Sequence, residues 1–522
     1  MTATLLRGGS VVDGSGAEPR RADVRIVADR VTAVGEIDAA SDDDVVDVSD
    51  RFVMPGFIDA HVHASPAMSQ NASDVHRALL SQGVTTVVLG QDGMGFAPGG
   101  RTSVAYATDY FGGIDGSPAV GLEAGATIGL LLDSYEGAAP INAACLVPAS
   151  LVRYDVMADP RSDPTPAELE RMVDAVARGV QDGAVGMSTG LQYVPGCHAS
   201  TDELIALCRP LSQLGAVHVS HMRGYEVEVE EGGREMLDIA TATSVKTHLS
   251  HLKGPADKVE KILQRGVDAG LNVTFDAYPY EHGSTLLAMA ALTADFQADG
   301  PQATLERLDN PAEARRLAAS WPESVLDEIG AYNLAGSLGP TFQADEGLSI
   351  GEAARHRRQV IRDYVVAILA DSQLRVTCVI PPRMSSSADT ARLATHPAYM
   401  ASSDGIYIGQ HPHPRGWGAF ARLLRVHVRE RRDWSWGQAA WFLSGHAADR
   451  FGLEDRGSVA VGAAADLAVV DPGAVTDEAS YDDPRRPASG IDRVVVNGAT
   501  VFAAGRLTGS SAGRALRRRR HR

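Results

Sequence analysis

Two histidines separated by one residue, His61 and His63, follow directly on the apolar run 52–58. Side chains two positions apart in an extended strand point to the same face, so both imidazoles would meet there. Neutral imidazole is the commonest metal ligand in proteins. One histidine at a strand end is usually structural, but this pair favours a metal site.

Other ionisable residues also follow apolar runs. They are Asp92 after residues 84–90, His221 after 216–220, His251 after 246–250, and Asp404 in the segment 401–405. In a (β/α)₈ barrel the carboxyl ends of the strands converge on one mouth, where the active sites of that fold lie. The common placement of these residues predicts a single metal-binding and acid/base centre at such a mouth.

Apolar strands and amphipathic helices alternate over about 400 residues, as in parallel α/β proteins. The clearest helix is predicted over 166–182, with Thr165 as the N-cap and Glu168 completing a capping box. We therefore expect an α/β chain with a (β/α)₈ barrel of the TIM type over residues 54–455. Residues 293–375 carry helical patches but no clear barrel strand, and we interpret them as an insertion. Its part from Thr293 to Tyr332 is expected to cover the barrel mouth.

The two ends of the chain share another pattern. Residues 1–53 and 456–508 contain short β-segments separated by Gly, Asp and Asn turns. Each half would leave unpaired strand edges, so we expect the halves to combine into one small β-sandwich. Residues 509–522 end in a cluster of arginines and are expected to be a disordered, solvated tail.

Composition narrows the class of protein. The formal net charge of −18 argues against a nucleic-acid partner. Four dispersed cysteines suggest neither a disulfide framework nor a zinc knuckle. No secretion signal is visible at the amino terminus, and no apolar run is long enough to span a bilayer. We expect a cytoplasmic protein without a membrane partner; the sequence does not set its oligomeric state.

Motifs along nearly the whole chain resemble those of one family, the N-acyl-D-amino-acid deacylases, or D-aminoacylases, of the amidohydrolase superfamily. In family order they are MPGFIDAHVH at 54–63, GAVGMSTGLQYVPG at 183–196, VSHMR at 219–223, LSHLK at 249–253, DAYPY at 276–280, GST at 283–285, SDG at 403–405, HPR at 413–415 and AADLAVVD at 464–471. The HxH pair alone is common, but the ordered set is highly specific.

The resemblance implies roles for particular residues. It makes His61, His63, His221 and His251 metal ligands, and it makes Asp404 the catalytic acid/base at the metal. The family usually places a cysteine ligand in a Gly-Asn-Cys-Gly turn, whereas this chain has Asp92 in the turn GQDG at 90–93. A carboxylate can still bridge two divalent ions, although it is a harder donor than a thiolate. We expect one or two divalent ions, zinc first and manganese as an alternative.

The resemblance also implies a substrate site. Tyr193, Lys253 and Arg415 would hold the α-carboxylate of the substrate, with Tyr278 and Ser284 beside the scissile group. Arg offers a planar fork for a carboxylate and Lys adds a point charge.

Several residues are expected to lie outside the metal centre. Many amidohydrolases bridge two metals with a carboxylated lysine on the fourth strand, but no lysine lies near the predicted fourth strand, 184–187. His218 and His248 lie three residues before His221 and His251, and they are expected to face the helices.

The expected function is metal-dependent hydrolysis of the linear amide of an N-acyl-D-amino acid, a small-molecule substrate. The alternatives are a cyclic-amide hydrolase resembling dihydropyrimidinases and hydantoinases, which needs no α-carboxylate clamp, and a barrel that has lost catalysis and serves as a binding protein. The replacement of the family's cysteine by Asp92 makes the last of these conceivable.

Overall fold

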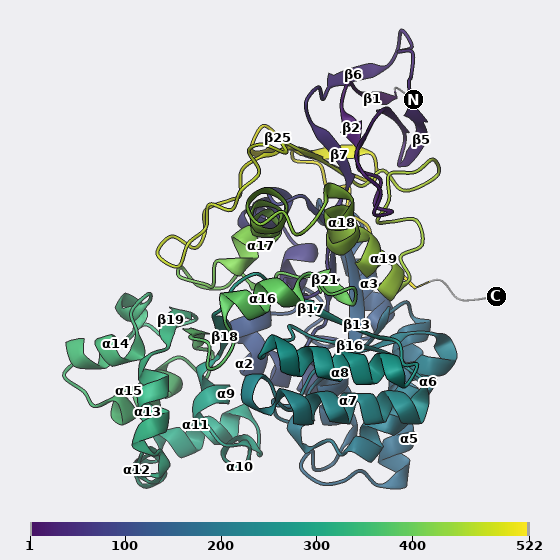
Figure 1. Cartoon of the computed structure of the whole chain (residues 1–522). Helices are drawn as coiled ribbons and strands as arrows, with labels where there is room; N and C mark the ends of the chain where they lie inside the picture. The colour runs from purple at the N-terminus through teal and green to yellow at the C-terminus, as the bar shows by residue number, and fades with distance from the viewer. Residues whose placement is uncertain (1–2, 519–522) are drawn as a thin grey trace.

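The chain forms a parallel barrel, a β-sandwich at one end of the molecule and a separate helical unit beside the barrel (Figure 1). A computed structural model describes residues 3–518. Within this range eight parallel strands form the barrel sheet, and its neighbours follow chain order. The strands are β8 (Phe57–Asp59), β10 (Val84–Leu89), β13 (Asn142–Pro148), β14 (Gly186–Gly190), β15 (Val217–His221), β16 (Lys246–Leu249), β17 (Val273–Ala277) and β21 (Tyr399–Ala401). The predicted TIM-type barrel is confirmed.

The first and last barrel strands are joined just beyond their ends. β9 (Val62–His63) pairs in parallel with β22 (Gly405–Ile406), so Ile406 lies opposite His63. The backbone N–H of Asp404 also donates to the carbonyl of His61 at 2.8 Å. This seam closes the barrel and places Asp404 next to the histidine pair.

Helices cover the outside of the barrel, and apolar side chains fill its interior. The interior cluster includes Ile58, Val88, Leu146 and Val219 from four different strands, and Phe451 of α19 (His446–Phe451) packs into the same cluster. The outer helices include α1 (Ser73–Leu80), α2 (Arg101–Asp115), α3 (Ile128–Tyr135), α4 (Ala149–Val156), α5 (Pro166–Gln181), α6 (Thr201–Leu214), α7 (Val229–Thr243), α8 (Ala256–Asp268), α16 (Ser387–Leu393) and α17 (Arg415–Leu423). The capping box of Thr165 and Glu168 is present at the start of α5, as predicted.

Strands from both ends of the chain form the β-sandwich. β7 (Phe52–Pro55) pairs antiparallel with β23 (Leu467–Val470), which joins the amino-terminal strands to β24 (Ile491–Val496) and β25 (Ala499–Ala503) in one sheet. A second sheet contains β1 (Thr4–Arg7), β4 (Asp23–Val27), β5 (Arg30–Gly35) and β6 (Asp44–Asp47). Apolar residues of both ends pack between these strands. The composite sandwich predicted from the two termini is present.

The inserted unit lies between β17 and β21, beside the barrel (Figure 1). Its antiparallel sheet consists of β18 (Gly283–Leu286), β20 (Thr377–Ile380) and β19 (Asn333–Gly336). Around it lie α9 (Leu287–Ala291), α10 (Ala294–Gln297), α11 (Pro301–Asp309), α12 (Pro311–Ser320), α13 (Glu323–Gly330), α14 (Ile350–His356) and α15 (Ile361–Asp371), which share a separate apolar core. The unit extends beyond the expected range 293–375, because β18 and β20 pair with each other at its base.

The expected disorder of the arginine-rich end is wrong for residues 509–518. Leu516 packs against the barrel-interior cluster, and its N–H donates to the carbonyl of Ala143 at 2.8 Å. Arg517 pairs with Asp133 at 2.6 Å. Backbone pairing and acidic partners on the barrel therefore hold this segment, whereas residues 519–522 lie outside the described range. Between residues 3 and 518, no helix is both long and apolar enough to cross a membrane.

Candidate metal centre and active site

Six ionisable side chains meet at the carboxyl ends of the barrel strands. His61 and His63 lie at the end of the first strand, Asp92 follows β10, His221 ends β15, His251 follows β16, and Asp404 follows β21. Among the described residues they form two groups that could hold a metal ion: His61, His63, Asp92 and Asp404, and Asp92, His221 and His251. Asp92 belongs to both groups, so the sequence-predicted ligands lie together as expected.

The distances around Asp92 suit a bridging carboxylate. Its Oδ1 lies 3.5 Å from Nε2 of both His61 and His251, and its Oδ2 lies 3.6 Å from His63 Nε2 and 3.8 Å from His221 Nδ1. Ligands of a tetrahedral zinc ion, each about 2.0–2.2 Å from the metal, lie roughly 3.3–3.6 Å apart. The spacing therefore fits divalent ions placed on either side of Asp92.

Unpartnered polar atoms support the same conclusion. Both ring nitrogens of His61 and Oδ1 of Asp92 are buried, and none of them has a hydrogen-bond partner among the described residues. Buried polar atoms normally find a partner, and an ion is one explanation when they do not. Burial opposes the charged form of His61, yet Asp92 and Asp276 raise its pKa to about 10. The cluster therefore attracts positive charge, as a cation site must.

Neighbouring groups orient two of the histidine rings toward the proposed metal site. Nε2 of His221 lies 2.8 Å from Gln192 Oε1, and Nδ1 of His63 lies 3.0 Å from Asp115 Oδ1. A nitrogen that donates to such an oxygen leaves the opposite nitrogen as the acceptor that binds metal. Burial also lowers the pKa of His221 to about 4, which keeps this ring neutral.

The backbone is strained where three of these residues lie. Asp92, His251 and Asp404 adopt φ angles of 55°, 33° and 47°, in the left-handed region that non-glycine residues rarely occupy. Strain of this kind concentrates at functional sites. A β-carbon at Gly190, the last residue of β14, would lie 2.0 Å from the carbonyl oxygen of Asp92. Glycine is therefore needed at this position, because the turn that contains Asp92 approaches β14 so closely.

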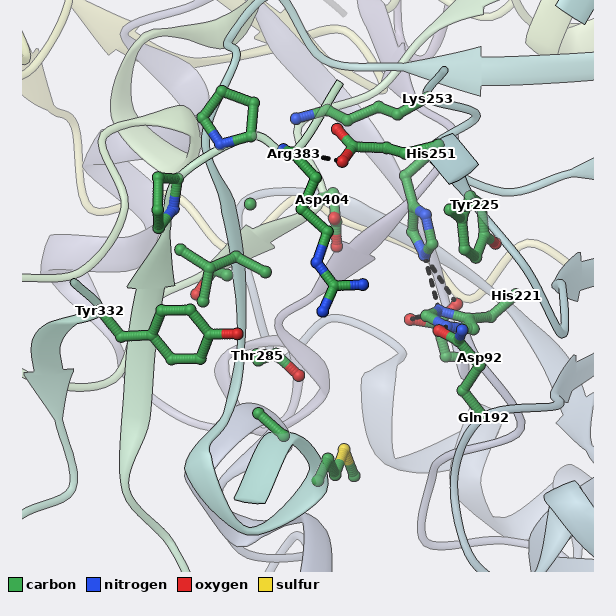
Figure 2. A pocket seen from close by; sticks show the side chains of 18 of the residues that line it. Asp92, Gln192, His221, Tyr225, His251, Lys253, Thr285, Tyr332, Arg383 and Asp404 are labelled. Carbon is green, nitrogen blue, oxygen red and sulfur yellow. Dashed lines mark hydrogen bonds and ion pairs between the residues drawn. The ribbon is translucent and has the colours of Figure 1, made fainter. Parts of the chain in front are cut away.

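A cavity of about 670 Å³ opens next to the candidate metal ligands, between the barrel and the inserted unit (Figure 2). Its lining includes all five predicted substrate residues: Tyr193, Lys253, Tyr278, Ser284 and Arg415. The ammonium of Lys253 and the guanidinium of Arg415 lie 4.1 Å and 4.4 Å from the centre of the Tyr278 ring. Two cations and an aromatic ring thus form one wall of the cavity.

Arg415 and Lys253 have different partners within this wall. Arg415 Nη1 lies 2.8 Å from Asp404 Oδ2. Lys253 donates to the carbonyls of Glu281 and His282 at 2.9 and 3.0 Å, and within residues 3–518 it forms no ion pair with a carboxylate. Burial, reinforced by the Arg415 charge, lowers the pKa of Lys253 to about 7. A carboxylate bound there would restore its ammonium form.

Comparison with known proteins agrees with this geometry. The model of a family described as the amidohydrolase family matches residues 44–502. This chain belongs to the amidohydrolase family. It is 32% identical to a D-aminoacylase of Alcaligenes xylosoxydans xylosoxydans, over 98% of this chain and 97% of the relative, and 33% identical to an N-acyl-D-glutamate deacylase of the same organism, over 95% and 93%.

Solved structures extend the comparison. The N-acyl-D-glutamate deacylase of Bordetella bronchiseptica, in complex with zinc and a phosphonate inhibitor, superposes with a TM-score of 0.82 at 30% identity, over 98% of this chain and 99% of that one. The dihydropyrimidinase of Brevibacillus agri reaches a TM-score of 0.54 at 16% identity, over 99% and 100% of the two chains, and shares the fold alone.

The structure of this amidohydrolase corrects one expectation about an individual residue. His248 does not face the helices: its Nε2 lies 2.9 Å from Asp276 Oδ2, beneath the proposed metal ligands. The chain turns at His251, where φ is positive, so the alternation of side chains along the strand cannot be counted back from His251. The Tyr193 hydroxyl lies 3.0 Å from His221 Nδ1, and the expected place of Tyr193 at the α-carboxylate stays a prediction.

Sequence reasoning missed three residues that support the ligands of this amidohydrolase. Asp115 and Gln192 orient His63 and His221, and Asp276 accepts from Ser402 Oγ at 2.6 Å and from the N–H of His251 at 3.0 Å. Asp276 lies in the DAYPY motif at the end of a barrel strand, so its position was a usable signal. Gln192 lies in the motif at 183–196, so its position was also a usable signal, whereas Asp115 lies at a helix end where no pattern identified it.

Proposed function

We propose that this amidohydrolase hydrolyses the linear amide of N-acyl-D-amino acids and releases a carboxylate and a free D-amino acid. The observation that carries the proposal is one cavity with a metal cluster on one side and two cations, Lys253 and Arg415, on the other. An N-acyl amino acid presents the matching groups, an acyl carbonyl and an α-carboxylate. The D configuration is supported by the relatives, which are a D-aminoacylase and an N-acyl-D-glutamate deacylase, and not by the geometry.

The metal ligands are proposed to be His61, His63, Asp92, His221, His251 and Asp404. A divalent ion in this cluster would lower the pKa of water toward ~7 and polarise the acyl carbonyl. Zinc suits the imidazole ligands, and the carboxylate of Asp92 in place of a thiolate makes manganese the alternative.

Asp404 is the proposed acid/base. Its carboxylate accepts a proton as the oxygen of water adds to the acyl carbon, and it returns that proton to the nitrogen as the carbon–nitrogen bond breaks. Without this transfer the leaving group would be an amide anion. Burial would raise the pKa of Asp404, but Arg415 and the nearby histidines outweigh it and hold that pKa below its ordinary value. The carboxylate is therefore ionised and ready to accept a proton.

Lys253 and Arg415 are proposed to bind the α-carboxylate, because they flank Tyr278 on the same wall. Ser284 and Tyr278 are proposed to lie beside the scissile group. Tyr193, which lines the same cavity, is proposed to bind the α-carboxylate together with Lys253 and Arg415.

A direct test compares N-acetyl-D-amino acids with hydantoin and dihydrouracil as substrates of the same metal-loaded protein. Turnover of N-acetyl-D-amino acids, with little or none of the rings, supports the proposal. Turnover of the rings alone would favour the cyclic-amide alternative. Absence of any turnover, together with less than one tightly held divalent ion per chain, would favour the binding-protein alternative. A cytoplasmic location and the absence of a nucleic-acid partner remain predictions of the sequence.

A further inference from the structure

The two cations proposed to bind the α-carboxylate come from elements that lie far apart in the chain. Lys253 lies in the loop after β16, whereas Arg415 is the first residue of α17. Both cations lie over the ring of Tyr278. One carboxylate can bind to both of them only if the protein holds them at a fixed separation, because small errors of position weaken binding and catalysis strongly.

One imidazole, that of His413, is hydrogen-bonded to the backbone beside both cations. Its Nδ1 accepts from the backbone N–H of Arg415 at 3.0 Å. Its Nε2 lies 3.1 Å from the carbonyl oxygen of His282, and the same oxygen accepts from Lys253 Nζ at 3.0 Å. The two hydrogen bonds of His413 therefore connect the start of α17 to the carbonyl that holds the Lys253 ammonium.

The partners of His413 determine its protonation state. A backbone N–H can only donate and a carbonyl can only accept, so Nδ1 carries no proton and Nε2 carries one. The hydroxyl of Tyr481 lies 3.5 Å from the same Nε2. Burial, reinforced by the charges of Arg415 and Lys253, holds the pKa of His413 well below its ordinary value. The ring is therefore neutral, and both of its nitrogens are used to connect backbone groups.

Aromatic neighbours hold the ring of His413 in one orientation. The rings of Tyr280 and Tyr481 each lie 5.3 Å from it, at interplanar angles of 88° and 77°, and the ring of Tyr278 lies 6.0 Å away. Edge-to-face contacts of this kind stabilise a defined arrangement of rings. His413 is 1% exposed and does not line the cavity. It can therefore act on a substrate only through the residues that it holds.

We propose that His413 is a positioning residue that holds Lys253 and Arg415 at the separation which the α-carboxylate requires. The inference rests on the proposed function and adds this residue to the proposed carboxylate site. Without the two hydrogen bonds, residues 281–282 and the start of α17 could move apart, so the loss should fall on KM more than on kcat. Neither hydrogen bond involves a proposed metal ligand, so the metal bound per chain should stay the same.

The test uses the N-acetyl-D-amino acid that the parent turns over best, together with its α-carboxamide. His413→Ala should raise KM for the acid at least about 10-fold and change kcat less than about 3-fold. The ratio of kcat/KM for the acid to that for the carboxamide should fall at least about 10-fold, because the carboxamide carries no charge for the two cations to bind. His427→Ala is the matched control, since His427 is also buried, bonds to Asp433 and does not line the cavity. It should leave KM and the ratio unchanged.

Two conservative variants separate the two hydrogen bonds. In His413→Asn the side-chain oxygen can still accept from the N–H of Arg415, two residues later, as in an Asx turn. In His413→Gln the longer amide can still donate to the carbonyl of His282. Each variant should give a KM and a ratio between those of the parent and of His413→Ala. If His413→Ala does not fold, these two variants decide, and parent values in both would overturn the inference.

Other outcomes separate the inference from the proposed function. An equal fall of kcat/KM for the acid and the carboxamide in His413→Ala would mean a purely structural role, which would overturn the inference and leave the proposed function standing. Parent values of KM and of the ratio in a folded His413→Ala would do the same. If the parent turns over no N-acetyl-D-amino acid, the proposed function is contradicted, and this inference with it.

Discussion

Arg415 and Asp404 form an ion pair inside the cavity, with Nη1 2.8 Å from Oδ2. Arg415 is 1% exposed and Asp404 is 6% exposed, so water screens the pair only weakly. The proposed carboxylate-binding group is thus bound, in the free protein, to the proposed acid/base. A substrate carboxylate that reaches Arg415 must share it with Asp404, which couples substrate binding to the state of the catalytic group.

Arg415→Lys should raise KM at least about 10-fold and weaken discrimination between D- and L-enantiomers. An ammonium keeps the charge but cannot bind a substrate carboxylate and Asp404 through separate nitrogens in a planar fork. Steady-state kinetics with both enantiomers of one N-acetyl amino acid would measure this. Arg422→Lys is the control in the same helix, since Arg422 binds Asp477 and does not line the cavity. If Arg415→Lys keeps the KM and the D/L ratio of the parent, Arg415 does not bind the substrate.

Asp92→Asn should lower kcat at least about 100-fold and reduce the metal bound per chain. The reason is that an amide cannot offer two anionic oxygens to divalent ions. Asp92→Cys should retain metal, because a thiolate also bridges divalent ions. Elemental analysis of the purified proteins would measure bound metal. Parent-like metal content and rate in Asp92→Asn would exclude Asp92 as a ligand.

Asp276→Asn should weaken metal affinity by about 10- to 100-fold while leaving the fold intact. Asp276 Oδ2 lies 3.6 Å from His61 Nδ1, and its Oδ1 accepts from the N–H of His251, so it orients two proposed ligands. Competition with a chelator of known affinity would give the dissociation constant. Asp268→Asn, at an exposed position at the end of α8, is the control. An unchanged constant in Asp276→Asn would assign Asp276 a purely structural role.

His446 should make the fold sensitive to mild acid. Burial lowers the pKa of His446 to about 4, below its value of 6.5 in an unfolded chain. Between pH 4 and pH 6.5 the unfolded state therefore binds a proton that the folded state does not bind. The free energy of unfolding falls as the pH drops from about 6.5 toward 4, by up to about 1.4 kcal/mol per pH unit. The free energy of unfolding of His446→Gln should change less over this range. If the free energy of unfolding depends on pH equally in the parent and in His446→Gln, His446 is not the source of the acid sensitivity.

The sequence was most informative about the barrel, because buried parallel strands are continuous apolar runs. β10 covers all but the last residue of the predicted run 84–90, whereas β14 begins and ends later than the predicted run 184–187. Its last residues, Ser188, Thr189 and Gly190, carry no apolar signal and are strand residues only through their neighbours. The ends of such strands are therefore determined by pairing with neighbouring strands, and the local sequence pattern does not predict them.

The proposed metal ligands could be found from the sequence because each of them follows an apolar run that forms a barrel strand. The residues that contact these ligands could not be found in this way. Asp115 reaches His63 from the end of α2, 52 residues later in the chain. Arg383 likewise pairs with Glu328 of α13 in the inserted unit, and Arg415, the first residue of α17, pairs with Asp404 after β21. Such contacts depend on the three-dimensional path of loops, which residue spacing does not encode.

The most direct test of the account measures kcat/KM for N-acetyl-D-leucine and N-acetyl-L-leucine in one preparation, first stripped of metal with a chelator and then reloaded with zinc or manganese. The account predicts that stripping removes activity, that a divalent ion restores it, and that the D-enantiomer is favoured by about 100-fold, because carboxylate and acyl carbonyl are held at two fixed points. Activity that survives complete removal of metal, or a preference for the L-enantiomer after reloading, would contradict it.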